Sequence, residues 1–185
     1  MADRVISWSL ATQYRNGAYN STFRFDMIQP AFDHMARYWQ LSFPRVTRNA
    51  RVSIVQANTS KNPTWAAWTN GNTIYISPTF NFGRNARISA KVILHEFAHA
   101  AGGGSHSSNP DALMAPDGGR SNGWIEDDLR WLRAYKLRGG MPPRGSLNEF
   151  NLLASAPGIQ SEEDLPGLKF GCNHWSVADW FRVAP

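Results

Sequence analysis

Alternating apolar and polar residues predict the strands of this chain. The alternation runs over residues 5–10 and again over 51–57, which is typical of strands with one buried face. In residues 65–78, WAAWTNGNTIYISP, an Asn-Gly pair separates two such runs and predicts a β-hairpin. The return strand of this hairpin is expected over residues 73–77.

Helical periodicity marks three further segments. An apolar stripe predicts a helix from about residue 22 to 39, and His34, which lies off this stripe, is expected at the surface. The stripe consists of Phe25, Ile28, Phe32, Met35, Ala36 and Trp39. A second helix is predicted over residues 86–101, where three glycines end it, and a third over residues 121–140.

The predicted elements fit one domain followed by an extension. The chain has 185 residues, of which 42% are apolar, enough for a substantial core. After Gly140 the sequence is broken by four prolines but keeps several aromatic residues. We therefore divide the chain into a domain at residues 1–140 and a Pro- and aromatic-rich extension at residues 141–185, which is expected to wrap the domain or dock on an assembly partner.

Charge and cysteine content exclude several classes of function. The net charge is +5, but the basic residues are scattered and no recognition motif accompanies them, so nucleic-acid binding is not expected. Cys172 is the single cysteine, which rules out an internal disulfide. No apolar run is long enough to span a membrane, and the first ten residues lack the apolar core of a signal peptide. We expect a cytoplasmic or particle-associated protein.

The chemistry of the chain concentrates in HEFAHAAGGGSHSSNPDALMAP, residues 95–116. Residues four apart lie on the same face of a helix, so His95 and His99 can both face one ion. Glu96 stands at the edge of that face, as the glutamate of an HExxH motif does when it acts as general base beside zinc. The alternative is a buried helix with two hydrogen-bonded histidines, and the motif alone leaves that alternative open.

A third ligand is expected from the segment that follows the helix. In the extended motif HExxHxxGxxH, Gly102 occupies the glycine position, but the third-ligand position holds Ser105. A histidine follows one residue later, at His106. Two additional glycines lie between, and they allow a wider turn through which His106 can still reach the metal.

The segment HSSNPDALMAP, from His106 to Pro116, resembles the matrixins, a branch of the metzincin zinc endopeptidases. The spacing from His106 to Met114 matches the matrixin pattern without a gap, and the predicted element order agrees over about three quarters of the chain. The resemblance implies an α+β, zincin-like fold. It would contain a twisted mixed sheet, an active-site helix, a long N-terminal helix and a C-terminal helix that includes Asp127 and Asp128.

The resemblance also implies roles for individual residues. His95, His99 and His106 would hold one catalytic Zn²⁺, Glu96 would be the general base, and Met114 would form the Met-turn under the metal. A peptide or protein substrate would lie against an edge strand, and a pocket wall would follow the Met-turn. The expected substrate-binding residues are Thr73, Ile74, Tyr75, Ile76, Ala115 and Pro116.

The sequence thus favours a zinc-dependent endopeptidase, with two alternatives. The first is a structural or interaction component of a virus or phage particle built on a metalloprotease scaffold, in which residues 141–185 bind neighbours. The second is a domain that binds cell-wall or glycan material through its eight Trp residues. Function depends on the site rather than on the fold, so the fold alone does not separate these hypotheses.

Overall fold

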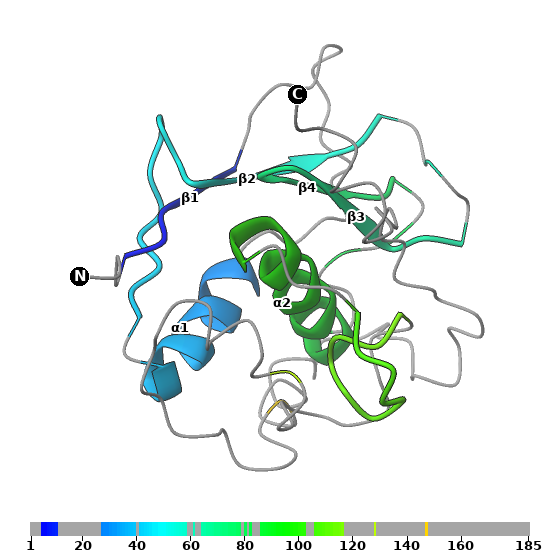
Figure 1. Ribbon diagram of the computed structural model, residues 1–185. Helices are drawn as coiled ribbons and strands as arrows, with labels where there is room; N and C mark the ends of the chain where they lie inside the picture. The colour runs from blue at the N-terminus through cyan, green and yellow to red at the C-terminus, as the bar shows by residue number, and fades with distance from the viewer. Residues whose placement is uncertain are drawn as a thin grey trace, which may run out of the picture.

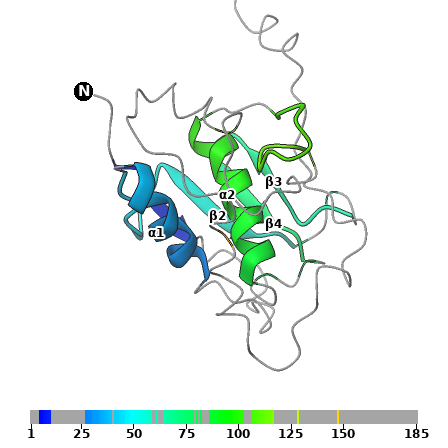
Figure 2. The ribbon, with the colours of Figure 1, turned by 90° about the horizontal axis from the view of Figure 1, so that it is seen from below.

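The described part of the chain forms a small α+β fold with one mixed sheet and two helices (Figure 1). Both helices lie on the same face of the sheet, which Figure 2 shows from the helical side. The structure is a computed structural model, and it describes residues 5–10, 27–39, 41–58, 61, 64–78, 80, 82, 86–102, 106–116, 128 and 147. It confirms the α+β class and the mixed sheet expected from the sequence.

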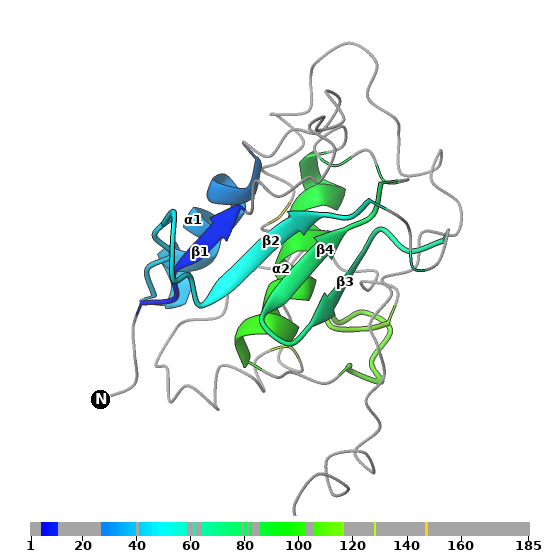
Figure 3. The same ribbon diagram turned by 90° about the horizontal axis from the view of Figure 1, so that it is seen from above.

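The sheet has four strands in the order β1-β2-β4-β3 (Figure 3). The strands are β1 (Trp8–Leu10), β2 (Val52–Gln56), β3 (Ala67–Asn70) and β4 (Thr73–Ile76). The first three in spatial order run parallel, and β3 is antiparallel to β4. All four lie in the segments where the alternating pattern predicts strands.

The hairpin predicted around the Asn-Gly pair is confirmed. Strands β3 and β4 pair with Asn70 opposite Thr73, so only Gly71 and Asn72 form the turn. Gly71 has a φ of 57°, a left-handed conformation that glycine adopts without steric penalty. This tight turn fixes the register of the hairpin, and therefore fixes which side chains face the helices.

The expectation that Thr73, Ile74, Tyr75 and Ile76 form an edge strand is wrong. Strand β4 pairs with β2 on one side and with β3 on the other, so its backbone groups are already used within the sheet. Ile74 and Ile76 are fully buried, and the ring of Tyr75 stacks on that of Trp68 at 5.4 Å. Among the described strands, the edge beside β4 is β3.

The first helix, α1, spans Ile28–Trp39, and Ile28, Phe32 and Met35 of its apolar stripe are fully buried. Pro30 lies in its first turn, where a backbone N–H would have no partner within the helix. His34 is fully buried, contrary to the surface position expected for it, and its ring lies 5.4 Å from that of Tyr38. The buried arc of α1 is therefore wider than the apolar stripe alone indicates.

The second helix, α2, spans Ala86–Gly102 and lies in the middle of the core. Seven consecutive residues, 92–98, have no exposed area at all. Aromatic rings join α2 to α1, with Phe97 4.6 Å from Phe32, which in turn lies 5.4 Å from Trp8 of β1. These contacts link α2 to α1 and, through Phe32, to β1 of the sheet.

Two described residues lie in the segments beyond residue 116. Asp128 belongs to the predicted third helix and Leu147 to the predicted extension; the rest of residues 117–185 lies outside the described residues. Leu147 is fully buried and belongs to the same hydrophobic core as α1 and α2. Within the described part of the chain, no helix is long and apolar enough to cross a membrane.

Candidate metal centre

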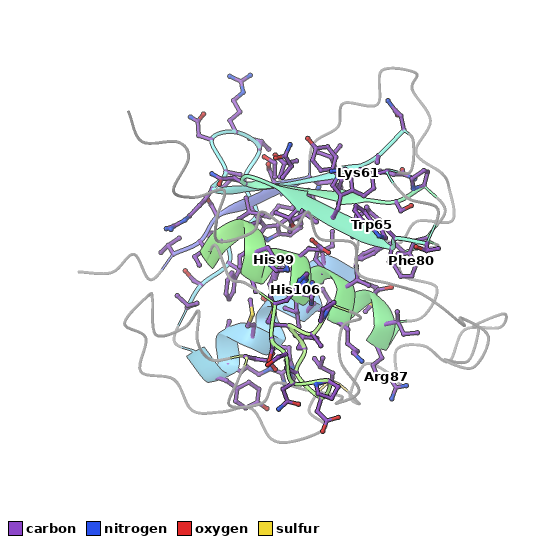
Figure 4. The ribbon with its side chains drawn as sticks, turned by 45° about the vertical axis from the view of Figure 1, so that its right-hand side comes forward. Lys61, Trp65, Phe80, Arg87, His99 and His106 are labelled. Carbon is purple, nitrogen blue, oxygen red and sulfur yellow. The ribbon has the colours of Figure 1, made fainter. Side chains whose placement is uncertain are left out.

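Three histidines converge beside α2. His95 and His99 lie one turn apart on the helix, and His106 comes from the segment that follows it, as Figure 4 shows for His99 and His106. One ligand nitrogen from each residue lies within 4.8 Å of the other two. His95 is fully buried and the other two are half-buried, so the three residues form a group that can hold a metal ion.

The hydrogen bonding of His95 fixes which of its nitrogens faces the other histidines. Its Nδ1 lies 2.7 Å from the carbonyl oxygen of Leu113, and a carbonyl only accepts, so Nδ1 carries the proton. The lone pair is therefore on Nε2, which lies 3.2 Å from Nε2 of His99. A carbonyl that orients a histidine in this way is the usual partner of a metal ligand.

Burial lowers the pKa of His95 well below its ordinary value. The nearby charge of His99 lowers it further, the hydrogen bond to Leu113 opposes the shift, and His106 and Lys91 add smaller lowering effects. His95 is consequently neutral over the physiological range of pH. Neutral imidazole is the form that binds a metal.

The spacing of one pair of nitrogens is compatible with a shared metal ion such as zinc. Two nitrogens bound to one zinc ion at about 2.0–2.1 Å in tetrahedral geometry lie roughly 3.3 Å apart. The distance of 3.2 Å between Nε2 of His95 and Nε2 of His99 agrees with this value. Three imidazoles are a ligand set that divalent transition-metal ions, zinc among them, accept.

A turn around Met114 carries the carbonyl that contacts His95. Met114 is buried, and its N–H donates to Asp128 Oδ1 at 2.8 Å. Its carbonyl oxygen accepts from the N–H of Ser107, also at 2.8 Å. The N–H of Leu113 donates to the other carboxylate oxygen of Asp128 at 3.0 Å. Asp128 therefore holds the same peptide segment whose carbonyl orients His95.

Glu96 is fully buried and is hydrogen-bonded to the sheet. The Thr69 hydroxyl on β3 lies 2.7 Å from Glu96 Oε2 and 3.1 Å from the backbone carbonyl oxygen of Glu96. A buried carboxylate is costly unless polar groups surround it, and this hydroxyl provides one such group. The glutamate of the motif is thus fixed between α2 and the edge strand.

Sequence reasoning identified the three histidines, Glu96 and Met114, and the structure brings the histidines together with the Met114 turn. Ala115 is buried beside that turn, Pro116 is exposed, and their expected role in a pocket wall stays a prediction. The contact of Thr69 with Glu96 and the hydrogen bonds from Leu113 and Met114 to Asp128 were missed. For Thr69 a signal existed, because the hairpin register places it opposite inward-facing Ile74.

No protein-family model matches this chain, and a search of the curated proteins finds no match either. The class of protein is therefore defined by its geometry alone. It is a small α+β protein with a three-histidine centre, in which a buried glutamate follows the first histidine.

Proposed function

We propose that the chain is a zinc-dependent endopeptidase of the matrixin-like metzincin type. The main support is the convergence of His95, His99 and His106 beside the buried carboxylate of Glu96. This arrangement contains the metal ligands and the general base that peptide hydrolysis requires. The Met114 turn and the element order up to residue 116 agree with the same proposal.

Zinc, when bound, would supply a Lewis acid that activates water and polarises the carbonyl of the scissile bond. The residues of the chain provide the remaining chemistry. The three histidines would hold the ion and leave one position open. Glu96 would accept a proton from the attacking water through its carboxylate and later deliver that proton to the leaving amine. Its hydrogen bond to Thr69 restrains rotation of the carboxylate.

We place the substrate along β3 instead of β4. In the described part of the sheet, β3 is the edge strand nearest the histidines, and α2 packs directly beneath it. An extended peptide adds to a sheet edge through main-chain hydrogen bonds, which gives affinity with little dependence on side chains. Ala115 and Pro116 follow the Met114 turn and remain our choice for the wall of a side-chain pocket.

Metal content and one substitution test this proposal. Purified protein loaded with zinc and then dialysed should retain one zinc per chain by elemental mass spectrometry, and His106→Ala should bind zinc more weakly. Zinc-loaded wild type should cleave peptides in a proteome-derived library, and Glu96→Gln should keep its zinc but cleave about 10²- to 10⁴-fold more slowly. Equal cleavage by both proteins would refute the role of Glu96.

The alternative role in a virus or phage particle depends on residues 141–185, of which the structure describes only Leu147. That residue lies in the core of the domain, which by itself favours neither role. Zinc binding without cleavage of any library peptide, together with self-assembly that is lost when residues 151–185 are removed, would favour the alternative over the endopeptidase.

A further inference from the structure

Thr69 occupies a position that connects the sheet edge to the candidate base. It lies in β3, and its side chain points toward α2, where the hydroxyl contacts Glu96 Oε2 at 2.7 Å. Thr69 is half-buried and Glu96 is fully buried, so this hydrogen bond is shielded from most competing water. A hydrogen bond in such surroundings restricts rotation of the carboxylate.

The backbone of Thr69 faces away from β4. The N–H of Ser77 donates to the carbonyl oxygen of Ala66 at 2.9 Å, which continues the β3–β4 ladder by one residue. Hydrogen-bonded pairs alternate along an antiparallel ladder, so Trp68 also bonds to β4 whereas Thr69 does not. The N–H and C=O of Thr69 therefore point toward the outer edge of the sheet.

We propose that Thr69 is a positioning residue that couples substrate pairing at the sheet edge to the orientation of Glu96. This inference rests on the endopeptidase function proposed above. The backbone of Thr69 pairs with the extended substrate, and its side chain holds one carboxylate oxygen of the base. Because both contacts come from a single residue, the substrate and the base share one reference point on β3.

The hydroxyl has a single proton and lies nearer to Glu96 Oε2, at 2.7 Å, than to the backbone carbonyl oxygen of Glu96, at 3.1 Å, so the carboxylate is its main acceptor. Thr69→Val keeps the shape and the strand preference of the side chain but removes the hydrogen bond to Glu96. The carboxylate then loses one of the contacts that position it, and misplacement of a catalytic group slows the chemical step more than it weakens substrate binding. The backbone groups of residue 69 remain, so substrate pairing is retained.

The first test is a kinetic comparison of Thr69→Val, Thr69→Ser and wild type, each loaded with zinc. Loss of the hydrogen bond should lower kcat about 10- to 100-fold and change KM less than threefold. Thr69→Ser retains the hydroxyl and should restore kcat to within about threefold of wild type. The control is Thr47→Val, the same substitution at an exposed position outside the sheet, which should leave kcat unchanged.

A double-mutant cycle shows whether Thr69 acts through Glu96. In the Glu96→Gln background, Thr69→Val should have little further effect on kcat, because the base is already absent. Equal losses in both backgrounds would overturn the inference, as would a Thr69→Val enzyme with wild-type kcat. Zinc content and urea unfolding of each variant exclude loss of metal or fold as the cause.

The coupling itself is tested with peptides in which one backbone amide at a time is replaced by an ester. Replacement at the position that pairs with Thr69 should lower kcat in the wild type and have a smaller effect in Thr69→Val. Equal effects in both proteins, or no effect at any position, would overturn the coupling. Failure of the endopeptidase proposal is recognised separately, because wild type and Glu96→Gln would then behave alike.

Discussion

Asp128 should be essential for both the stability of the fold and the affinity of the metal centre. Its carboxylate is buried and accepts hydrogen bonds from the N–H groups of Leu113 and Met114 at 3.0 and 2.8 Å. A hydrogen bond to a charged group contributes roughly 1.5–3 kcal/mol. Asp128→Ala removes both bonds and leaves two buried N–H groups behind, so we expect the free energy of unfolding to fall by about 3–5 kcal/mol.

The same substitution should weaken metal binding, because the carbonyl of Leu113 orients His95. Loss of a group that orients a metal ligand typically lowers metal affinity about 10- to 100-fold. Urea unfolding of the metal-free protein measures the stability, and competition with a chromophoric chelator measures the zinc affinity. Asp128→Asn retains one acceptor oxygen, so its free energy of unfolding should fall by about half as much as that of Asp128→Ala. It therefore provides a folded variant if Asp128→Ala does not fold.

Asp111→Asn is the matched control for this experiment. It removes the same charge from the same segment, but Asp111 is only half-buried, and the described hydrogen bond of this residue uses its backbone N–H. Its stability and zinc affinity should stay within about 0.5 kcal/mol and threefold of wild type. A folded Asp128→Asn protein with the zinc affinity of wild type would refute the reasoning that Asp128 supports the centre through Leu113.

Three further outcomes follow from the described side chains. Leu147 is fully buried in the core, so Leu147→Ala should lower the free energy of unfolding, measured in urea, by about 2–5 kcal/mol. For the same reason, a chain ending at residue 140 should be less stable than one ending at residue 150. The metal-free protein should become less stable as the pH falls below about 6.5. Burial lowers the pKa of His95 in the folded protein, so the unfolded chain binds a proton at this pH and the folded chain does not. A flat profile of unfolding free energy between pH 7 and 5, measured in urea, would contradict this. Lys91→Met should tighten zinc binding measurably in the chelator assay, because the positive charge one turn before His95 repels a cation.

The sequence predicted the elements of the fold well, because its apolar patterns are local. The strands, the hairpin turn at Gly71 and α2 lie where periodicity and turn chemistry predict them. The order of strands is not local: nothing in residues 73–76 indicates that β4 inserts between β2 and β3. The edge strand was therefore misassigned although both strands of the hairpin were correctly predicted.

In the candidate site, too, the local features were predictable and the long-range contacts were not. His95 and His99 were predictable because a helix fixes their separation, and His106 because of its spacing to Met114. Asp128 reaches the Met114 turn across a separation of 14 residues, and Thr69 reaches Glu96 across 27. Contacts at such separations depend on how the elements pack; the hairpin register indicates that Thr69 faces inward with Ile74, but not that it meets Glu96. His34 was misassigned for a related reason, since burial depends on what packs against a helix.

The seven fully buried residues at 92–98 have a consequence for how this protein tolerates change. This stretch contains His95 and Glu96 of the candidate site together with core residues such as Phe97 and Leu94. A substitution at any of these positions alters either the core packing or the site, because none of the seven side chains reaches the surface. We expect a saturation library to find few tolerated substitutions in this stretch, so variants with altered stability but intact chemistry must be sought elsewhere in the chain.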